Sequence, residues 1–319
     1  MFQYNVIQKG IMHDFYGMPC QDALETFSYQ DVICTALSDG VSACRLGGEV
    51  AKMLSSRAAI QFAQFFADYC QMTDDELRAE VVALIRDVQR RLAIDYAEKG
   101  EAVSLADMGA TLALVVYNKR TEEYIALNLG DGAVLARREG CEAAETLLPP
   151  VKINMGGALL PVVTVYDAAL IHRHISIHHG KGVHDAFLLS SDGMDGVLFS
   201  GETGEVSPSV GYLMRNLVED PQGVRDFLPG EIARLQLNDD ASVAMLVHSS
   251  PVPETFIDRS KASIPGKEKR RARQCAVYGE ERCKGKDRKF AGRKAGISLK
   301  DKHEWHNLQA RLKRVGFDD

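Results

Sequence analysis

Four aspartates lie where apolar segments of this chain begin or end. Asp39, Asp131 and Asp192 each end such a segment, in VICTALSDG, YIALNLGDG and FLLSSDG, whereas Asp239 precedes the segment ASVAMLV. If the last segment is a strand antiparallel to the other three, all four carboxylates reach one rim of a sheet or sandwich. Neighbouring strands are about 4.8 Å apart, and carboxylates at that spacing repel unless a cation lies between them. Oxygen ligands without His or Cys favour Mg²⁺, Mn²⁺ or Ca²⁺ over Zn²⁺.

A glycine follows Asp39, Asp131 and Asp192. Glycine lets the backbone turn tightly and approach closely, so the carbonyl of Gly40 is a further candidate ligand. Asp-Gly is also a common turn dipeptide, and four independent turns are the alternative interpretation. The placement of all four carboxylates at strand ends favours the cation site.

Short segments rich in Val, Ile, Leu and Ala predict the strands that must position these aspartates. We expect strands over 31–38, 110–118, 122–130, 186–191 and 241–248, with others near 2–8, 27–29, 134–137 and, more loosely, 162–176.

Two long helices are expected between the first and second of the main strands. One spans about 48–70, and the other opens at Thr73, which has capping-box spacing to Glu76. The apolar residues of the second helix recur every three or four positions, which indicates one buried face: Leu77, Val81, Leu84, Val88 and Leu92. Long helices among many short strands predict an α+β domain with helices packed on the outer faces of sheets.

Composition divides the 319 residues into an acidic body and a basic tail. Residues 259–319 hold 19 Lys and Arg against 8 Asp and Glu, a net charge of +11, which leaves the rest at −17. Pro, Ser and basic residues replace the apolar periodicity near residue 250, so we expect a folded domain over 1–250 and a tail, a linker with a short helix, over 251–319. No transmembrane run or signal peptide is recognised, and the seven cysteines are scattered, which predicts a cytoplasmic protein.

Six motifs together resemble one known family. CQDALETF, CTALSDGVSACRLGGEVAK, MGATLALVV, YIALNLGDGAVLARREG, FLLSSDGMDGVL and NDDASVAML follow the order and approximate spacing of the metal-dependent protein phosphatases of type 2C, particularly the compact bacterial branch. The resemblance covers roughly residues 5–248. It implies a central antiparallel β-sandwich flanked by pairs of α-helices, with a binuclear Mn²⁺ or Mg²⁺ centre at one end.

The resemblance also implies roles for individual residues. Asp39 would bridge both metals and Gly40 would offer its carbonyl to one of them. Asp192 and Asp239 would ligate the other metal. Asp22, beside Gln21 in the acidic pair, would contact a metal through a bound water or support the residues that ligate it directly.

Asp131 and Asp195 match positions of a third, more weakly held metal, although the family more often places the second aspartate of FLLSSDGMDG four residues after the first rather than three. The chemistry implied is hydrolysis of phosphoserine or phosphothreonine in proteins by a hydroxide that bridges two metals, in opposition to a kinase. Well-known members carry an Arg just before the acidic pair, and YGMPCQD has none. His13 and Arg45 are the nearest candidates for the proton donor and the phosphate-binding cation, with a surface His and a solvated Arg as the alternatives.

The sequence also allows alternative functions and binding sites. The missing Arg is also consistent with a pseudophosphatase or phosphoprotein-binding module. Alternation in HRHISIHH places His172, His174 and His178 on one face of a strand, as an exposed polar face or a zinc site. The basic tail could bind nucleic acid or an anionic surface, or act as a solvated arm. It also contains an irregular zinc set, which comprises Cys275, Cys283, His303 and His306.

Overall fold

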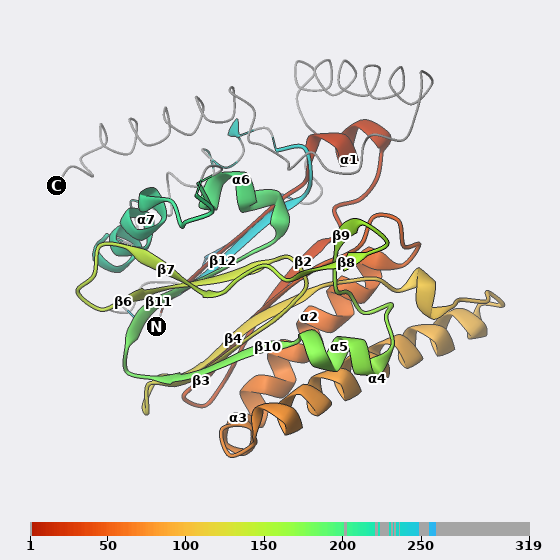
Figure 1. Cartoon of the computed structure of the whole chain (residues 1–319), viewed down its shortest axis with the longest axis horizontal. Helices are drawn as coiled ribbons and strands as arrows, with labels where there is room; N and C mark the ends of the chain where they lie inside the picture. Colours follow the sequence, from red (N-terminus) through yellow and green to blue (C-terminus); the bar gives the residue numbers. More distant parts are fainter. Residues whose placement is uncertain are drawn as a thin grey trace.

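The computed structural model describes residues 2–200, 203–220, 223, 230, 232, 234, 235, 237–248 and, for the backbone, 255–259. Two β-sheets stack face to face and helices cover their outer faces (Figure 1). The described strands are β1 (Phe2–Gln8), β2 (Asp22–Tyr29), β3 (Val32–Asp39), β4 (Leu112–Asn118), β5 (Glu123–Leu129), β6 (Ala133–Arg138), β7 (Ala144–Leu148), β8 (Lys152–Met155), β9 (Ala158–Pro161), β10 (Ser176–Lys181), β11 (His184–Ser190), β12 (Ala241–Val247) and β13 (Thr255–Arg259).

One sheet has the order β13-β1-β12-β11-β6-β7 and the other β10-β5-β4-β3-β2, while β8 and β9 form a separate hairpin. Every ladder between described strands is antiparallel except the β1–β13 pair. The expected α+β sandwich is therefore confirmed. Because β13 pairs with β1, the sheet continues into the segment that composition assigns to the tail.

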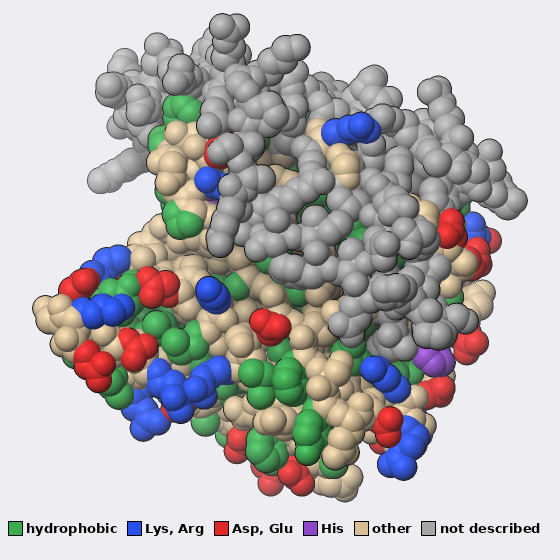
Figure 2. All heavy atoms as spheres, turned by 180° about the vertical axis from the view of Figure 1, so that it is seen from behind, with side chains coloured by type: hydrophobic (Ala, Val, Ile, Leu, Met, Phe, Trp, Pro, Cys, Tyr) green, Lys and Arg blue, Asp and Glu red, His purple; other side chains and the backbone are tan. Residues whose placement is uncertain are grey.

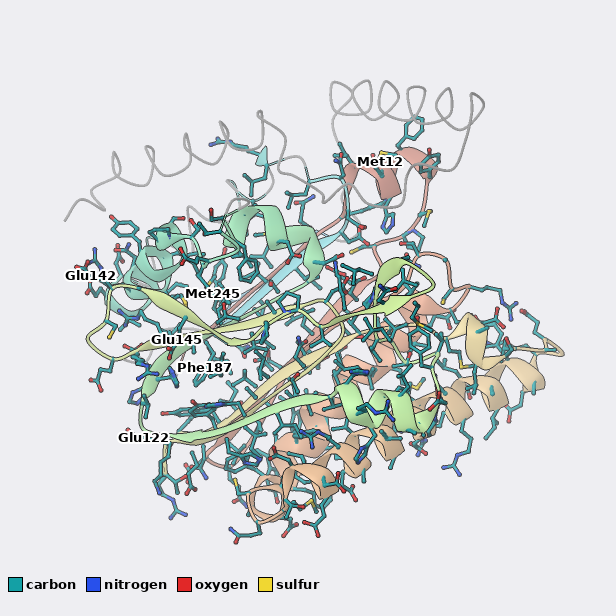
Figure 3. The ribbon with its side chains drawn as sticks, in the orientation of Figure 1. Met12, Glu122, Glu142, Glu145, Phe187 and Met245 are labelled. Atoms are coloured by element: carbon teal, nitrogen blue, oxygen red, sulfur yellow. The ribbon has the colours of Figure 1, made fainter. Side chains whose placement is uncertain are left out.

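A closed apolar layer fills the space between the two sheets. Phe187 of β11 is fully buried there, with its ring centroid 4.7 Å from that of Tyr124 and 6.1 Å from that of Tyr117. Met245 of β12 belongs to the cluster on the opposite face of its sheet (Figure 3). Side chains of the same sheet thus alternate between the inner layer and the helices outside.

Helices α1 (Ile11–Tyr16), α2 (Gly47–Gln64), α3 (Phe66–Tyr69), α4 (Asp74–Glu98), α5 (Ala168–His174), α6 (Asp195–Leu198) and α7 (Pro208–Glu219) complete the described regular structure, with two short 3-10 turns. Helix α2 packs on β2, β3 and β4, and α4 packs on α2, whereas α7 packs on β7, β11 and β12. The capping box of Thr73 and Glu76 is confirmed. The five apolar residues predicted for one face of α4 are all buried.

The loosely predicted strand over 162–176 is wrong. Asp167 accepts a hydrogen bond from the Leu170 N–H and begins α5 there, so the segment turns into a helix before β10. His172 and His174 consequently lie on α5 and His178 on β10, not on one strand face. The zinc set and the expected tail helix fall outside the described residues.

No helix in the described ranges is long and apolar enough to cross a membrane. On the face turned away from Figure 1, acidic and basic side chains are interspersed, as Figure 2 shows. The charged positions of special interest lie instead at one end of the sandwich.

Candidate functional site

The strand-end aspartates meet across the two sheets. Asp39 ends β3 and lies directly opposite Asp22, the first residue of β2. Strand β12 runs antiparallel to β11, so Asp239 before β12 and Asp192 after β11 lie at the same end of their sheet. We call the group formed by Asp22, Asp39, Asp131, Asp192, Asp195 and Asp239 the acidic rim.

The backbone of Asp39 and Gly40 is held by Thr111, just before β4, by Gln21 and by the start of α2. The Thr111 N–H donates to the Asp39 carbonyl over 2.8 Å, and the Asp39 N–H donates to Oγ1 of Thr111 over 3.0 Å. The Gly40 N–H donates to the Gln21 carbonyl over 3.2 Å. A Cβ at Gly40 would overlap the backbone of Gly47, where α2 begins. The glycine after Asp39 is therefore required by the close approach of α2.

Asp22 is tied to the other sheet through a serine. Oγ of Ser191 donates to Oδ2 of Asp22 over 2.7 Å and accepts from the Ser242 N–H over 2.9 Å. Asp22 is only 6% exposed, and its Oδ1 has no hydrogen-bond partner among the described residues. A buried carboxylate oxygen without a partner is costly unless a cation or water binds it.

Burial and mutual repulsion make the rim reluctant to ionise. Burial and the charges of nearby aspartates raise the pKa of Asp22 to about 7 and that of Asp39 well above its usual range. The same causes raise the pKa of Asp192 to about 6 and that of Asp195 to about 7, although Lys152 opposes both shifts. A divalent cation would offset this repulsion. The donor set, all oxygen and all acidic, fits Mn²⁺ or Mg²⁺.

The rim is a concentration of acidic oxygens rather than a closed cage. Across the described ranges, no group of three His, Cys, Asp or Glu side chains already surrounds a single point at ligand distance. Asp239, with a side chain that is 61% exposed, faces solvent. Such an exposed carboxylate can rotate toward a cation that the other rim aspartates would hold.

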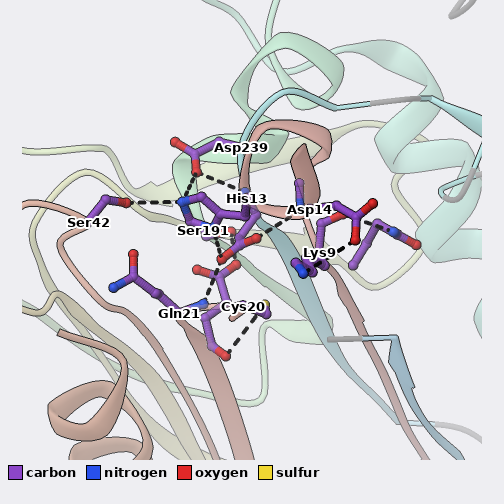
Figure 4. Close-up of polar contacts among 12 residues, drawn as sticks. Lys9, His13, Asp14, Cys20, Gln21, Ser42, Ser191 and Asp239 are labelled. Carbon is purple, nitrogen blue, oxygen red and sulfur yellow. Dashed lines mark hydrogen bonds and ion pairs between the residues drawn. The ribbon is translucent and has the colours of Figure 1, made fainter. Parts of the chain in front are cut away.

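His13 on α1 lies at the edge of the rim, between Ser42 and Asp239 (Figure 4). Its Nδ1 is 2.7 Å from Oδ2 of Asp240, and its Nε2 is 3.2 Å from Oγ of Ser42 and 3.8 Å from Oδ1 of Asp239. The hydrogen bond that His13 donates to Asp240 raises the pKa of His13, an effect that burial partly opposes and the nearby carboxylates reinforce.

Asp240 was missed by the sequence reasoning, which selected only its neighbour. Its side chain is buried and accepts hydrogen bonds from the Gly10 N–H over 2.8 Å and from the Gln21 N–H over 2.6 Å. Burial raises the pKa of Asp240, but these two hydrogen bonds and the one from His13 lower it by more, so its pKa lies below the usual value. Asp240 thus stays ionised and orients His13. Two adjacent aspartates in NDDAS signal an acidic site, but not which of them is buried.

Arg45, the other sequence candidate, is engaged elsewhere. Its guanidinium lies 3.1 Å from the carboxylate of Glu101, donates to the Ala102 carbonyl and covers the Tyr96 ring. None of these contacts involves the acidic rim. Among the described residues, the basic side chains next to the rim are His13 and Lys152.

Comparison with known proteins places this arrangement in a family. Residues 9–229 match the family Protein phosphatase 2C. The chain belongs to the protein phosphatase 2C family. Members usually bind Mn²⁺ or Mg²⁺. Among curated proteins, none matches the chain.

Solved structures show the same phosphatase 2C fold. The serine/threonine phosphatase Stp1 from Staphylococcus aureus is 15% identical, with a TM-score of 0.53 over 78% of this chain and 96% of that one. A bacterial serine phosphatase bearing a point mutation is 14% identical, with a TM-score of 0.50 over 79% of this chain and 100% of that one. At these identities the likeness is one of fold.

The stability of this phosphatase 2C chain should depend on pH through the rim. The pKa values of Asp22 and Asp195, about 7 in the folded chain against 3.8 normally, mean that the folded state binds more protons between those values. That contribution is complete below pH 3.8 and is lost as the pH rises through about 7. The melting temperature of the metal-free protein should therefore fall between about pH 5 and about pH 8.

Mn²⁺ should raise the melting temperature, and more so at the higher pH, because the carboxylates are then free of protons. Calorimetry at both pH values with and without Mn²⁺ measures this. Equal shifts at the two pH values would contradict the view that the carboxylates with raised pKa values are those that would hold a cation.

Proposed function

We propose that the chain is a protein serine/threonine phosphatase that depends on Mn²⁺ or Mg²⁺. The observation that carries this proposal is the convergence of acidic side chains from both sheets on one rim, where burial and repulsion raise their pKa values. Such a set is unfavourable on its own and becomes favourable around cations. Membership of the phosphatase 2C family supports a phosphoprotein substrate, the product of a Ser/Thr kinase.

Asp39, the Gly40 carbonyl, Asp192 and Asp239 are the residues proposed to hold two cations, with Asp22 orienting water behind them. When bound, the cations supply a hydroxide near neutral pH and offset charge on the phosphoryl group. The chain's own contribution is position: Thr111 fixes the backbone of Asp39.

His13 is proposed to donate the proton that the leaving alkoxide needs. Asp240 stays ionised and accepts a hydrogen bond from Nδ1, and the raised pKa of His13 favours a second proton on Nε2, the nitrogen that lies toward Ser42 and Asp239. An imidazolium stabilised by a buried carboxylate is a suitable general acid near neutral pH.

The substitution His13→Gln should therefore reduce turnover of two substrates to different extents. Turnover of a phosphothreonine peptide should fall by about 10²-fold, the scale of a lost general acid. Turnover of p-nitrophenyl phosphate should change far less, because its leaving group needs no proton. His179→Gln is the matched control, since His179 pairs with Asp74 on α4 at 3.4 Å. Equal losses on both substrates would remove His13 from this role.

The function itself is tested with purified full-length protein, a phosphothreonine peptide and p-nitrophenyl phosphate. Phosphate release should require added Mn²⁺ or Mg²⁺ and stop with a chelator. Activity that survives chelation, or a folded protein with none, would overturn the proposal.

A second candidate is a phosphoprotein-binding module without turnover. The engagement of Arg45 with Glu101 favours it, because this removes one cation expected to hold phosphate. Calorimetric titration with a phosphopeptide at saturating Mn²⁺ distinguishes the two: tight binding without phosphate release would support the module.

A further inference from the structure

A lysine reaches the acidic rim from the hairpin of β8 and β9. Nζ of Lys152, the first residue of β8, lies 3.1 Å from Oδ2 of Asp131. The Asp131 side chain is 8% exposed and that of Lys152 is 39% exposed, so the pair lies where the rim meets solvent. The ammonium also attracts Asp192 and Asp195.

The fold itself holds this lysine in place. The Val151 N–H donates to the Gly130 carbonyl over 2.8 Å, which attaches the base of the hairpin to the turn between β5 and β6. The buried side-chain amide of Asn128 donates to the carbonyls of Gly132 and Pro149, over 2.8 and 3.1 Å, and so joins the same two segments again. Lys152 and Asp131 therefore lie on two backbone segments that hydrogen bonds hold together, unlike the partners of a chance contact between mobile surface side chains.

We call Asp131, Asp192 and Asp195 the outer acidic group. The Lys152 ammonium pairs with Asp131, and it also attracts the charges of Asp192 and Asp195. Oδ1 of Asp195 is buried and accepts no hydrogen bond from the described residues. A single lysine therefore lowers the repulsion within the group without satisfying all of its oxygens.

We propose that Lys152 is an internal counter-cation of the outer acidic group and competes there with a divalent cation. The inference rests on the proposed function, because it concerns a further ion beside the two at Asp39. The ammonium bound to the Asp131 oxygen is positive, so it repels a divalent cation that approaches the group. It also blocks the Asp131 oxygen as a ligand for that cation. The outer position of this chain consequently fills only at higher Mn²⁺ concentration than its three carboxylates would otherwise need.

The test is titration of the full-length protein with MnCl₂ in a calorimeter, which does not depend on activity. Lys152→Gln should tighten the weakest Mn²⁺ binding step by about tenfold or add one bound ion in the same concentration range. Lys152→Arg, which keeps the charge, should bind as the unaltered chain does. Lys181→Gln should also leave binding unchanged, because Lys181 pairs with Glu123 at 3.2 Å on β10 and β5.

A double variant locates the effect. Adding Asp131→Asn to Lys152→Gln should abolish the gain in Mn²⁺ binding. If Lys152→Gln binds Mn²⁺ with unchanged or lower affinity while Asp39→Asn weakens binding, the inference about Lys152 is overturned and the proposed function stands. If neither the unaltered chain nor Lys152→Gln binds Mn²⁺, both are overturned.

Discussion

Asp39→Asn is expected to lower kcat/KM for a phosphothreonine peptide by roughly 10³-fold or more, the scale of a lost interaction with charge that develops in the transition state. Asp39 lies at the centre of the rim, facing Asp22 across the β2–β3 ladder and interacting with Asp192 and Asp239. An amide cannot supply the negative charge that two cations require.

The same substitution should raise the melting temperature of the metal-free protein near neutral pH, because it removes the cost of keeping a carboxyl group either charged or protonated among the other buried aspartates. It should also abolish most of the stabilisation by Mn²⁺. Asp31→Asn is the matched control: Asp31 lies just before the opposite end of β3, with a side chain that is 60% exposed. Activity within a few-fold of the unaltered chain after Asp39→Asn would exclude Asp39 from the site.

Phe187→Ala should lower the free energy of unfolding by about 3–5 kcal/mol, the range for a buried phenylalanine truncated to alanine. Phe187 is fully buried in the layer between the two sheets, against Tyr117 and Tyr124. The cavity would loosen the contact between the sheets whose strand ends form the rim.

Urea denaturation measures this effect. The shift in the midpoint urea concentration gives the change in the free energy of unfolding when the dependence of that free energy on urea is the same in both proteins. Phe65→Ala is the control, because Phe65 is 49% exposed after α2 and its loss should cost no more than about 0.5 kcal/mol. A cost below about 1 kcal/mol for Phe187→Ala would show that the layer is not the core of the domain.

The parts of the fold that the sequence predicted are those with strong local patterns. Strands β3, β4, β5, β11 and β12 are continuous apolar runs because both of their faces are buried. Strands β8 and β9 were missed because their half-exposed residues produce no such run. The mistaken strand over 162–176 contains Val and Ile, and its helix is signalled only by the cap at Asp167.

The residues of the candidate site also differ in how far local sequence could predict them. Asp39, Asp131, Asp192 and Asp239 could be predicted because each lies at or beside a strand end, where the chain itself determines its position. Asp22 and Asp195 were predicted from the resemblance instead. Ser191, Asp240 and Lys152 could not be predicted, since each acts through a partner far away in sequence: Asp22, His13 and Asp131, respectively. Local pattern carries no information about such contacts, which depend on the pairing of strands far apart in the sequence and on the packing of the sheets and the β8–β9 hairpin.

The central claim is that the acidic rim binds divalent cations, and anomalous diffraction from crystals grown with MnCl₂ tests it most directly. Two strong manganese peaks are expected between Asp39, Asp192 and Asp239, with a third, weaker peak near Asp131 appearing on Lys152→Gln. Well-ordered crystals at saturating Mn²⁺ without a peak at the rim would contradict it.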